Sequence, residues 1–76
     1  MTIQDEALSG RISCVLVQDK RLGGQAIAVR VTAGEVFLKG VVDNAELREL
    51  AELVARGIPG VRQVNVEELH VKEAHE

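Results

Sequence analysis

One stretch decides the fold of this chain: Ile27-Ala-Val-Arg-Val-Thr-Ala-Gly-Glu-Val-Phe-Leu-Lys-Gly-Val-Val42. Apolar residues alternate with other residues up to Thr32, the alternation stops at Ala33-Gly34-Glu35, and it resumes at Val36. A period of two is typical of β-strands, and a glycine between two such runs indicates a turn that needs positive φ. The stretch therefore predicts a β-hairpin over about residues 25–42.

The alternation divides the hairpin's side chains between two faces, and the branched face needs a cover that a hairpin cannot supply for itself. The side chains expected to face the cover are Ile27, Val29, Val31, Val36, Leu38 and Val42. The side chains expected to face away from it are Ala26, Ala28, Arg30, Thr32, Phe37, Lys39 and Val41. Gly40 suits a close approach of a helix to the sheet.

The segment before the hairpin predicts an amphipathic helix over about residues 3–20, with Thr2 as its N-cap. Its apolar stripe comprises Ile3, Ala7, Leu8, Ile12, Val15 and Leu16. Gly10 costs up to about 1 kcal/mol relative to Ala, so either the helix tolerates a weak point or a neighbouring backbone passes close. Cys14, among apolar residues, is expected to be a small buried side chain.

The segment after the hairpin predicts a second helix over about residues 44–56. Asp43 or Asn44 suits the N-cap, and Glu46 follows Asp43 at the spacing of a capping box. Gly57 is expected to adopt the left-handed conformation just past the last turn. The apolar stripe of this helix comprises Leu47, Leu50, Ala51, Val54 and Ala55.

A third strand is expected over about residues 61–72, after a turn at Ile58-Pro59-Gly60. Its two apolar pairs, which differ in phase by one residue, are Val64 with Val66 and Leu69 with Val71. A bulge near Glu67-Glu68 would put all four on one face. A right-handed crossover would make this strand parallel to the second strand of the hairpin.

The order of elements predicts one α+β domain over residues 1–76, an αββαβ two-layer sandwich. Two helices are expected to pack on one face of a three-stranded mixed sheet.

Composition argues against a nucleic-acid partner. The net charge of −3 opposes the attraction of phosphates, and Phe37 alone makes up the aromatic share of 1%, so the chain has little with which to stack on bases. Gly57-Ile58-Pro59-Gly60 spells the Gly-x-x-Gly of a KH loop, but it joins a helix to a strand, whereas a KH loop joins two helices.

The residues that can ligate metals or perform catalysis do not form a convincing site. His70, His75 and Glu76, with Cys14 as a fourth ligand, lack the closely spaced Cys and His pairs of structural zinc sites. Asp43 and Glu46 are better explained as helix caps than as an acid/base pair. We therefore expect no cofactor, no metal and no enzymatic activity.

The chain begins Met1-Thr-Ile-Gln-Asp-Glu, without the basic start and apolar run of a secretory signal. No stretch approaches the roughly 20 apolar residues of a membrane span. We expect a cytoplasmic protein that can lie peripherally at the membrane, and a periplasmic one if the chain is a fragment of an exported protein. Cys14, the only cysteine, fits either compartment.

The most specific motif is Val-x-x-Gly-x-Val-x-Leu-x-Gly-x-Val from Val31 to Val42, followed by Pro59-Gly60-Val61. Further matching positions are Leu8, Ile12, Leu16, Asp19, Leu22, Ile27, Val29, Ala51, Ala55 and Val64. Over nearly the whole chain, this spacing resembles the BON domain, the bacterial OsmY and nodulation domain. The resemblance implies an αββαβ fold, attachment to phospholipid membranes, mostly in the bacterial envelope, and no catalytic residues. The chain departs from the family by one extra residue before Leu69 and by the absence of an export signal.

Two groups of side chains are candidates for binding a lipid surface or a partner. Phe37 and Val41 form an apolar patch on the open sheet face, with Arg30 and Lys39 beside it; such a patch can dock a protein, a second copy or anionic lipid, or be an ordinary half-exposed strand. The second group is Arg11, Lys20 and Arg21, near the first helix. We expect a non-catalytic interaction module at phospholipid surfaces; the alternative is protein–protein contact or homo-oligomerisation through the open sheet face.

Overall fold

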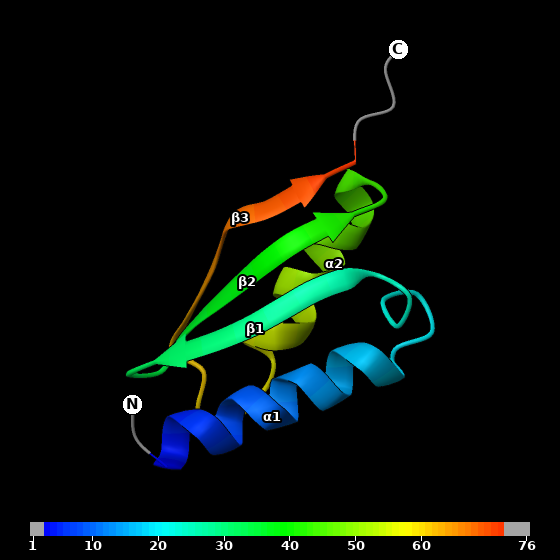
Figure 1. Cartoon of the computed structure of the whole chain (residues 1–76). Helices are drawn as coiled ribbons and strands as arrows, with labels where there is room; N and C mark the ends of the chain where they lie inside the picture. Colours follow the sequence, from blue (N-terminus) through cyan, green and yellow to red (C-terminus); the bar gives the residue numbers. More distant parts are fainter. Residues whose placement is uncertain (1–2, 73–76) are drawn as a thin grey trace.

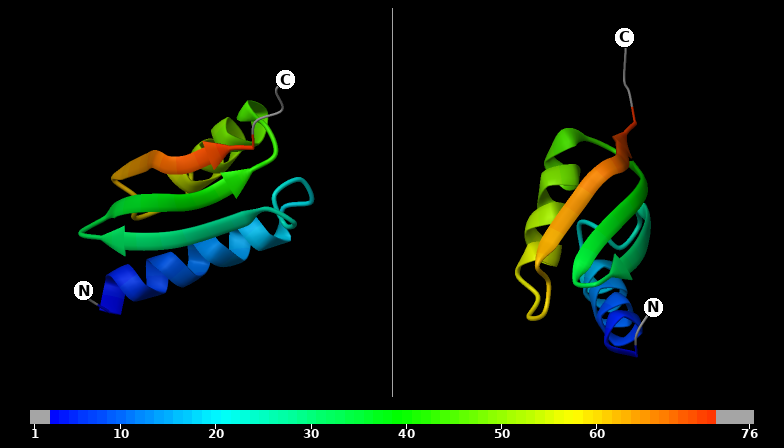
Figure 2. Two further views of the ribbon diagram at one scale, coloured as in Figure 1. Left: turned by 45° about the horizontal axis from the view of Figure 1, so that its top comes forward. Right: turned by 90° about the vertical axis from the view of Figure 1, so that its left-hand side faces the viewer.

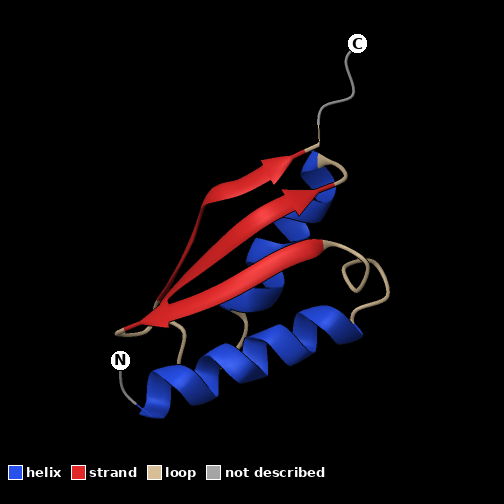
Figure 3. Ribbon diagram, in the orientation of Figure 1, coloured by secondary structure: helices blue, strands red, loops and turns tan. Residues whose placement is uncertain are grey.

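The computed structural model describes residues 3–72 of the chain. In order, its elements are α1 (Ile3–Gln18), β1 (Ala26–Thr32), β2 (Glu35–Val42), α2 (Ala45–Arg56) and β3 (Gln63–Val71) (Figure 1). The strands form one sheet in the order β1-β2-β3, with β1 antiparallel and β3 parallel to β2. Both helices lie on the same side of this sheet (Figures 2 and 3). The predicted αββαβ fold class and the parallel third strand are confirmed.

The hairpin turns at two residues, Ala33 and Gly34, with φ of 52° and 84°, and Glu35 already belongs to β2. Two successive positive φ values between paired strands are typical of a type I′ turn, whose twist matches that of the strands. The predicted left-handed conformation of Gly34 is confirmed. Ala33 has a Cβ and tolerates this conformation less easily, so its backbone needs support from outside the turn.

The core lies between the sheet and the two helices, and the apolar faces of β1 and β2 turn toward it. Its buried side chains are Leu8, Ile12, Leu16, Leu22, Val31, Val36, Leu38, Val42, Ala51, Ala55, Ile58 and Leu69. Ile27 and Val29, together with the other apolar residues of the α2 stripe, are half-buried against this cluster. The predicted inward face of the hairpin and the predicted stripe of α2 are therefore confirmed.

The predicted stripe of α1 is correct in only half of its positions. Ile3 is 84% exposed and Val15 is 36% exposed, and Ala7 is also exposed. Cys14 is exposed as well, so the prediction that it is buried was wrong. The reason is that α1 carries apolar residues on two opposite sides, and a sequence alone does not say which side meets the sheet.

Of the two residues predicted as the N-cap of α2, Asn44 is the cap and Asp43 is not. The Asn44 side chain accepts a hydrogen bond from the Leu47 N–H at 2.9 Å, whereas Asp43 exchanges hydrogen bonds with Gln25. Because Asn44 is the cap, Glu46 does not occupy the capping-box position.

At the other end of α2, Gly57 has a right-handed backbone conformation, with φ of −78°, which contradicts the predicted left-handed conformation. The left-handed residue is Gly60, with φ of 98°, at the end of the following turn.

Gly40 lies close to a strand and not, as predicted, to a helix. A Cβ at this position would collide with the carbonyl oxygen of Ala26 on β1, and its φ is 138°. The close backbone approach is therefore real, but the approaching backbone belongs to the neighbouring strand.

The predicted bulge in β3 is present, one residue earlier than expected. Phe37 pairs with Asn65 and Lys39 pairs with Glu68, so two residues of β3 oppose Leu38. The guanidinium of Arg48 on α2 donates to the carbonyl oxygens of Leu69 at 2.8 Å and Val66 at 3.2 Å. Val66 lies in the bulge and Leu69 lies just beyond it, so this half-buried arginine holds the irregular part of β3 against the helix.

We predict that Arg48→Ala lowers the free energy of unfolding by about 1.5–3 kcal/mol, the usual worth of hydrogen bonds to a charged group. Chemical denaturation measures this loss. The control is Arg56→Ala on the same helix, which removes an exposed ion pair with Glu52 at 2.7 Å and should cost about 0.5 kcal/mol or less. Equal losses for the two variants would contradict the role assigned to Arg48.

Candidate functional site

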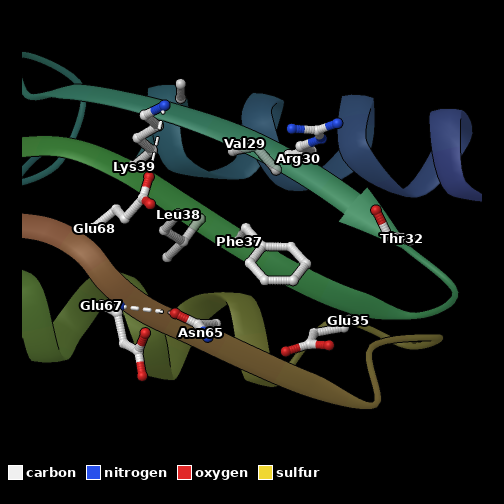
Figure 4. A pocket seen from close by; sticks show the side chains of 11 residues that line it. Val29, Arg30, Thr32, Glu35, Phe37, Leu38, Lys39, Asn65, Glu67 and Glu68 are labelled. Carbon is white, nitrogen blue, oxygen red and sulfur yellow. Dashed lines mark hydrogen bonds and ion pairs between the residues drawn. The ribbon is translucent and has the colours of Figure 1, made fainter.

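The sheet face turned away from the helices carries an open groove of about 510 Å³ (Figure 4). Phe37 lies half-buried in the middle of this groove, and its neighbours across the ladders are Arg30 on β1 and Asn65 on β3. Val41, predicted for the same patch, lies further along β2, is 45% exposed and is not part of the groove. The groove is lined by Ala28, Val29, Arg30, Thr32, Glu35, Phe37, Leu38, Lys39, Asn65, Glu67 and Glu68.

The charges around this groove are mixed and negative in sum. Lys39 forms an ion pair with Glu68 at 3.6 Å, with both side chains largely exposed (Figure 4). Glu35 and Glu67 line the same groove, while Arg30 has no ion pair among the described residues. Two cations therefore face three carboxylates, which weakens the attraction of this face for an anionic surface.

A second groove, of about 890 Å³, lies at the tip of the hairpin, where the first turns of α1 meet the loop between α2 and β3. The buried carboxylate of Asp5 accepts a hydrogen bond from the Ala33 N–H at 3.1 Å, which supports the strained turn residue. The Arg62 N–H donates to the Gly34 carbonyl at 2.8 Å, and its side chain packs over Gly34. We call this region the hairpin-tip groove; it is lined by Gln4, Asp5, Ala7, Leu8, Arg11, Thr32, Ala33, Gly34, Pro59, Gly60 and Arg62.

The hairpin-tip groove brings together two arginines, Arg11 and Arg62, whose side chains form no hydrogen bond or ion pair within the described residues. Arg11 was a candidate from the sequence, but Arg62 was missed. No local signal singles Arg62 out, because its place beside Gly34 follows from the pairing of β2 with β3.

Lys20 and Arg21 do not join Arg11. They follow the end of α1 at Gln18, which lies seven residues beyond Arg11 and therefore, at about 1.5 Å per helical residue, roughly 10 Å further along the axis. Arg21 also forms an exposed ion pair with Asp19 at 3.6 Å. The three cations that the sequence grouped together therefore belong to two separate regions.

Among residues 3–72, no group of three His, Cys, Asp or Glu side chains is arranged to hold a metal ion. Two of the ligands weighed from the sequence, His75 and Glu76, lie outside the described residues, as does the expected N-cap Thr2. None of the described helices has the length and apolarity needed to cross a bilayer.

Comparison with known proteins gives three findings. The family model of the BON domain matches residues 4–73. Osmotically-inducible protein Y of Escherichia coli (strain K12) is 31% identical over 74 residues, which cover 97% of this chain and 36% of that protein's length. A solved structure of CdsD, a structural protein of the type III secretion system of Chlamydia trachomatis, shares the fold, with a TM-score of 0.75 and 22% identity over 92% of this chain and 32% of that one.

The αββαβ architecture, the match over residues 4–73 and the identity to Osmotically-inducible protein Y agree with the resemblance read from the motifs. This chain therefore belongs to the BON domain family.

Proposed function

We propose that this chain is a non-catalytic interaction module that attaches to phospholipid membrane surfaces through its hairpin-tip groove. The observation that carries the proposal is the pair Arg11 and Arg62, which line one groove without ion-pair partners among the described residues. Ile3, next to the groove at the start of α1, is 84% exposed. Exposed apolar side chains insert at a bilayer interface, and cations nearby attract its anionic head groups.

The expected affinity is low. Each arginine near an anionic leaflet contributes about 1 kcal/mol, and burial of Ile3 adds about 2 kcal/mol. The sum of about 4 kcal/mol corresponds to an apparent dissociation constant of about 1 mM lipid, and the net charge of −3 works against it. Such weak contact suits a module that acts beside other membrane-binding domains. It needs only an exposed anionic leaflet, so it can operate in the cytoplasm or, in an exported protein, in the periplasm.

The other candidate surfaces are less suited to lipid. The open sheet face carries more carboxylates than cations, with Lys39 already paired to Glu68. At the far end of α1, Asp19 partly neutralises Arg21, which leaves Lys20 as the cation there that forms no ion pair within residues 3–72.

We predict that anionic bicelles, and not neutral ones, shift the amide NMR signals of residues around Ile3, Gly34 and Arg62. Arg62→Gln should weaken this binding about fivefold, the equivalent of one cation near the leaflet. The matched control is Lys20→Gln, which removes an exposed cation at the opposite end of α1 and should leave the affinity unchanged.

Shifts confined to Lys20 and Arg21, or to Phe37 and Val41, would place the lipid contact on one of the other surfaces and reject the hairpin-tip groove. No shift with either lipid would reject membrane attachment for this chain.

The open sheet face favours a second candidate function, contact with a protein or a second copy. Phe37 offers an aromatic anchor in a groove whose rim carries both signs of charge, and such a surface matches a folded partner better than a uniformly anionic membrane.

We predict that, if copies associate through this face, Phe37→Glu converts the oligomer to a monomer, because the added carboxylate would be desolvated in the contact. Light scattering measures the mass. Leu53→Glu, at a 64% exposed position of α2 outside the groove, is the matched control and should leave the mass unchanged. A mass that Phe37→Glu does not alter would remove the open sheet face as a self-association surface.

A further inference from the structure

The side of α1 that faces away from the core is apolar along its whole length. We call it the outer stripe; its residues are Ile3, Ala7, Gly10, Cys14 and Val17. All five are exposed, Ile3 by 84% and Val17 by 65%. A Cβ added at Gly10 would meet nothing within 4 Å, so no backbone approaches this glycine and its presence is not explained by packing within the chain.

The outer stripe follows the spacing of a coiled-coil seam. Its steps of four, three, four and three residues place Ala7 and Cys14 at a positions and Ile3, Gly10 and Val17 at d positions of a heptad. Figures 1 and 2 show α1 along the margin of the molecule, with the sheet and α2 to one side of it. The opposite side is therefore accessible to a second helix, and the small residues in its middle allow a close approach of backbones.

The charges beside the outer stripe indicate which helix fits it. Glu6 precedes an a position and Arg11 follows a d position, so they occupy g and e. Neither forms an ion pair within the described residues. In a parallel pair of helices, a g residue faces the e residue five positions further along the other helix, which pairs Glu6 of each copy with Arg11 of the other. In an antiparallel pair, g faces g and e faces e, and the two charges do not meet.

We propose that two copies of this chain form a parallel homodimer in which the outer stripes of the two α1 helices pack against each other. The two Glu6–Arg11 pairs are related by the two-fold axis and flank the seam. A contact over four helical turns with small central residues belongs to the weak, transient class of interfaces, below about 1,200 Å² in total. The surface is distinct from the open sheet face around Phe37.

A charge-swap cycle followed by sedimentation equilibrium tests the pairing. At low salt and protein concentrations from about 10 µM to 1 mM, Glu6→Lys or Arg11→Glu alone should weaken dimerisation about fivefold or more, because two attractive contacts become repulsive. The double variant Glu6→Lys/Arg11→Glu should restore the dimer. Circular dichroism checks that each variant is folded, and the restoring double variant separates lost pairing from lost structure.

A cross-linking experiment tests the direction of the helices. At an a position of a parallel seam, Cys14 lies next to Cys14 of the partner copy, so oxidation by diamide should join the wild-type chains in a covalent dimer. The control variant Cys14→Ser/Leu53→Cys moves the thiol to another exposed site, on α2, and should cross-link at least tenfold more slowly.

Three results would overturn the proposal: a monomer at every concentration, a double charge-swap variant that stays as weak as the single ones, or equal cross-linking by the two thiol positions. Because Ile3 and Arg11 also belong to the proposed lipid contact, these measurements are made without lipid and the lipid test relies on Arg62, which lies outside the outer stripe. Failure of one proposal therefore leaves the other standing.

Discussion

Burial of one face of the β1–β2 hairpin is the interaction on which the rest of this structure depends. A two-stranded hairpin is only marginally stable in water. Here the hairpin is stabilised because two helices cover its branched side chains and a third strand extends the sheet beside it. Val36 and Leu38, at the centre of that face, are almost completely buried. Burial of this apolar surface holds both helices against the sheet.

Hydrogen bonds with polar side chains of the helices lie where the sheet departs from regular strand geometry. Asp5 supports the positive φ of Ala33 at the hairpin tip, and Arg48 binds the carbonyl group of Val66 in the bulge of β3 and that of Leu69 just beyond it. Each contact joins a helix to an irregular part of the sheet. Together they set how the helices are placed along the strands, which burial of apolar surface alone specifies weakly because it has no direction.

The same arrangement produces three surfaces with different electrostatic character on a chain of net charge −3. The open sheet face pairs Lys39 with Glu68 and is acidic in sum, the hairpin-tip groove gathers Arg11 and Arg62, and the outer stripe of α1 is apolar with one charge of each sign beside it. A net charge therefore says little about which surface binds which partner, since attraction depends on local charge within about a Debye length.

The sequence by itself determined the order of elements, the inward and outward faces of the hairpin, the left-handed turn at Gly34 and the presence of a bulge. These features depend on residues that are neighbours along the chain, where the periods of strands and helices act directly. Only the tertiary structure decided that α1 turns Leu8, Ile12 and Leu16 inward and leaves Ile3 and Cys14 outside, that Gly40 faces a strand, and that Arg62 joins Arg11 while Lys20 does not. The physical reason is that a helix with two apolar sides has two nearly equivalent ways to pack, and the choice between them is made by contacts between residues far apart in the sequence.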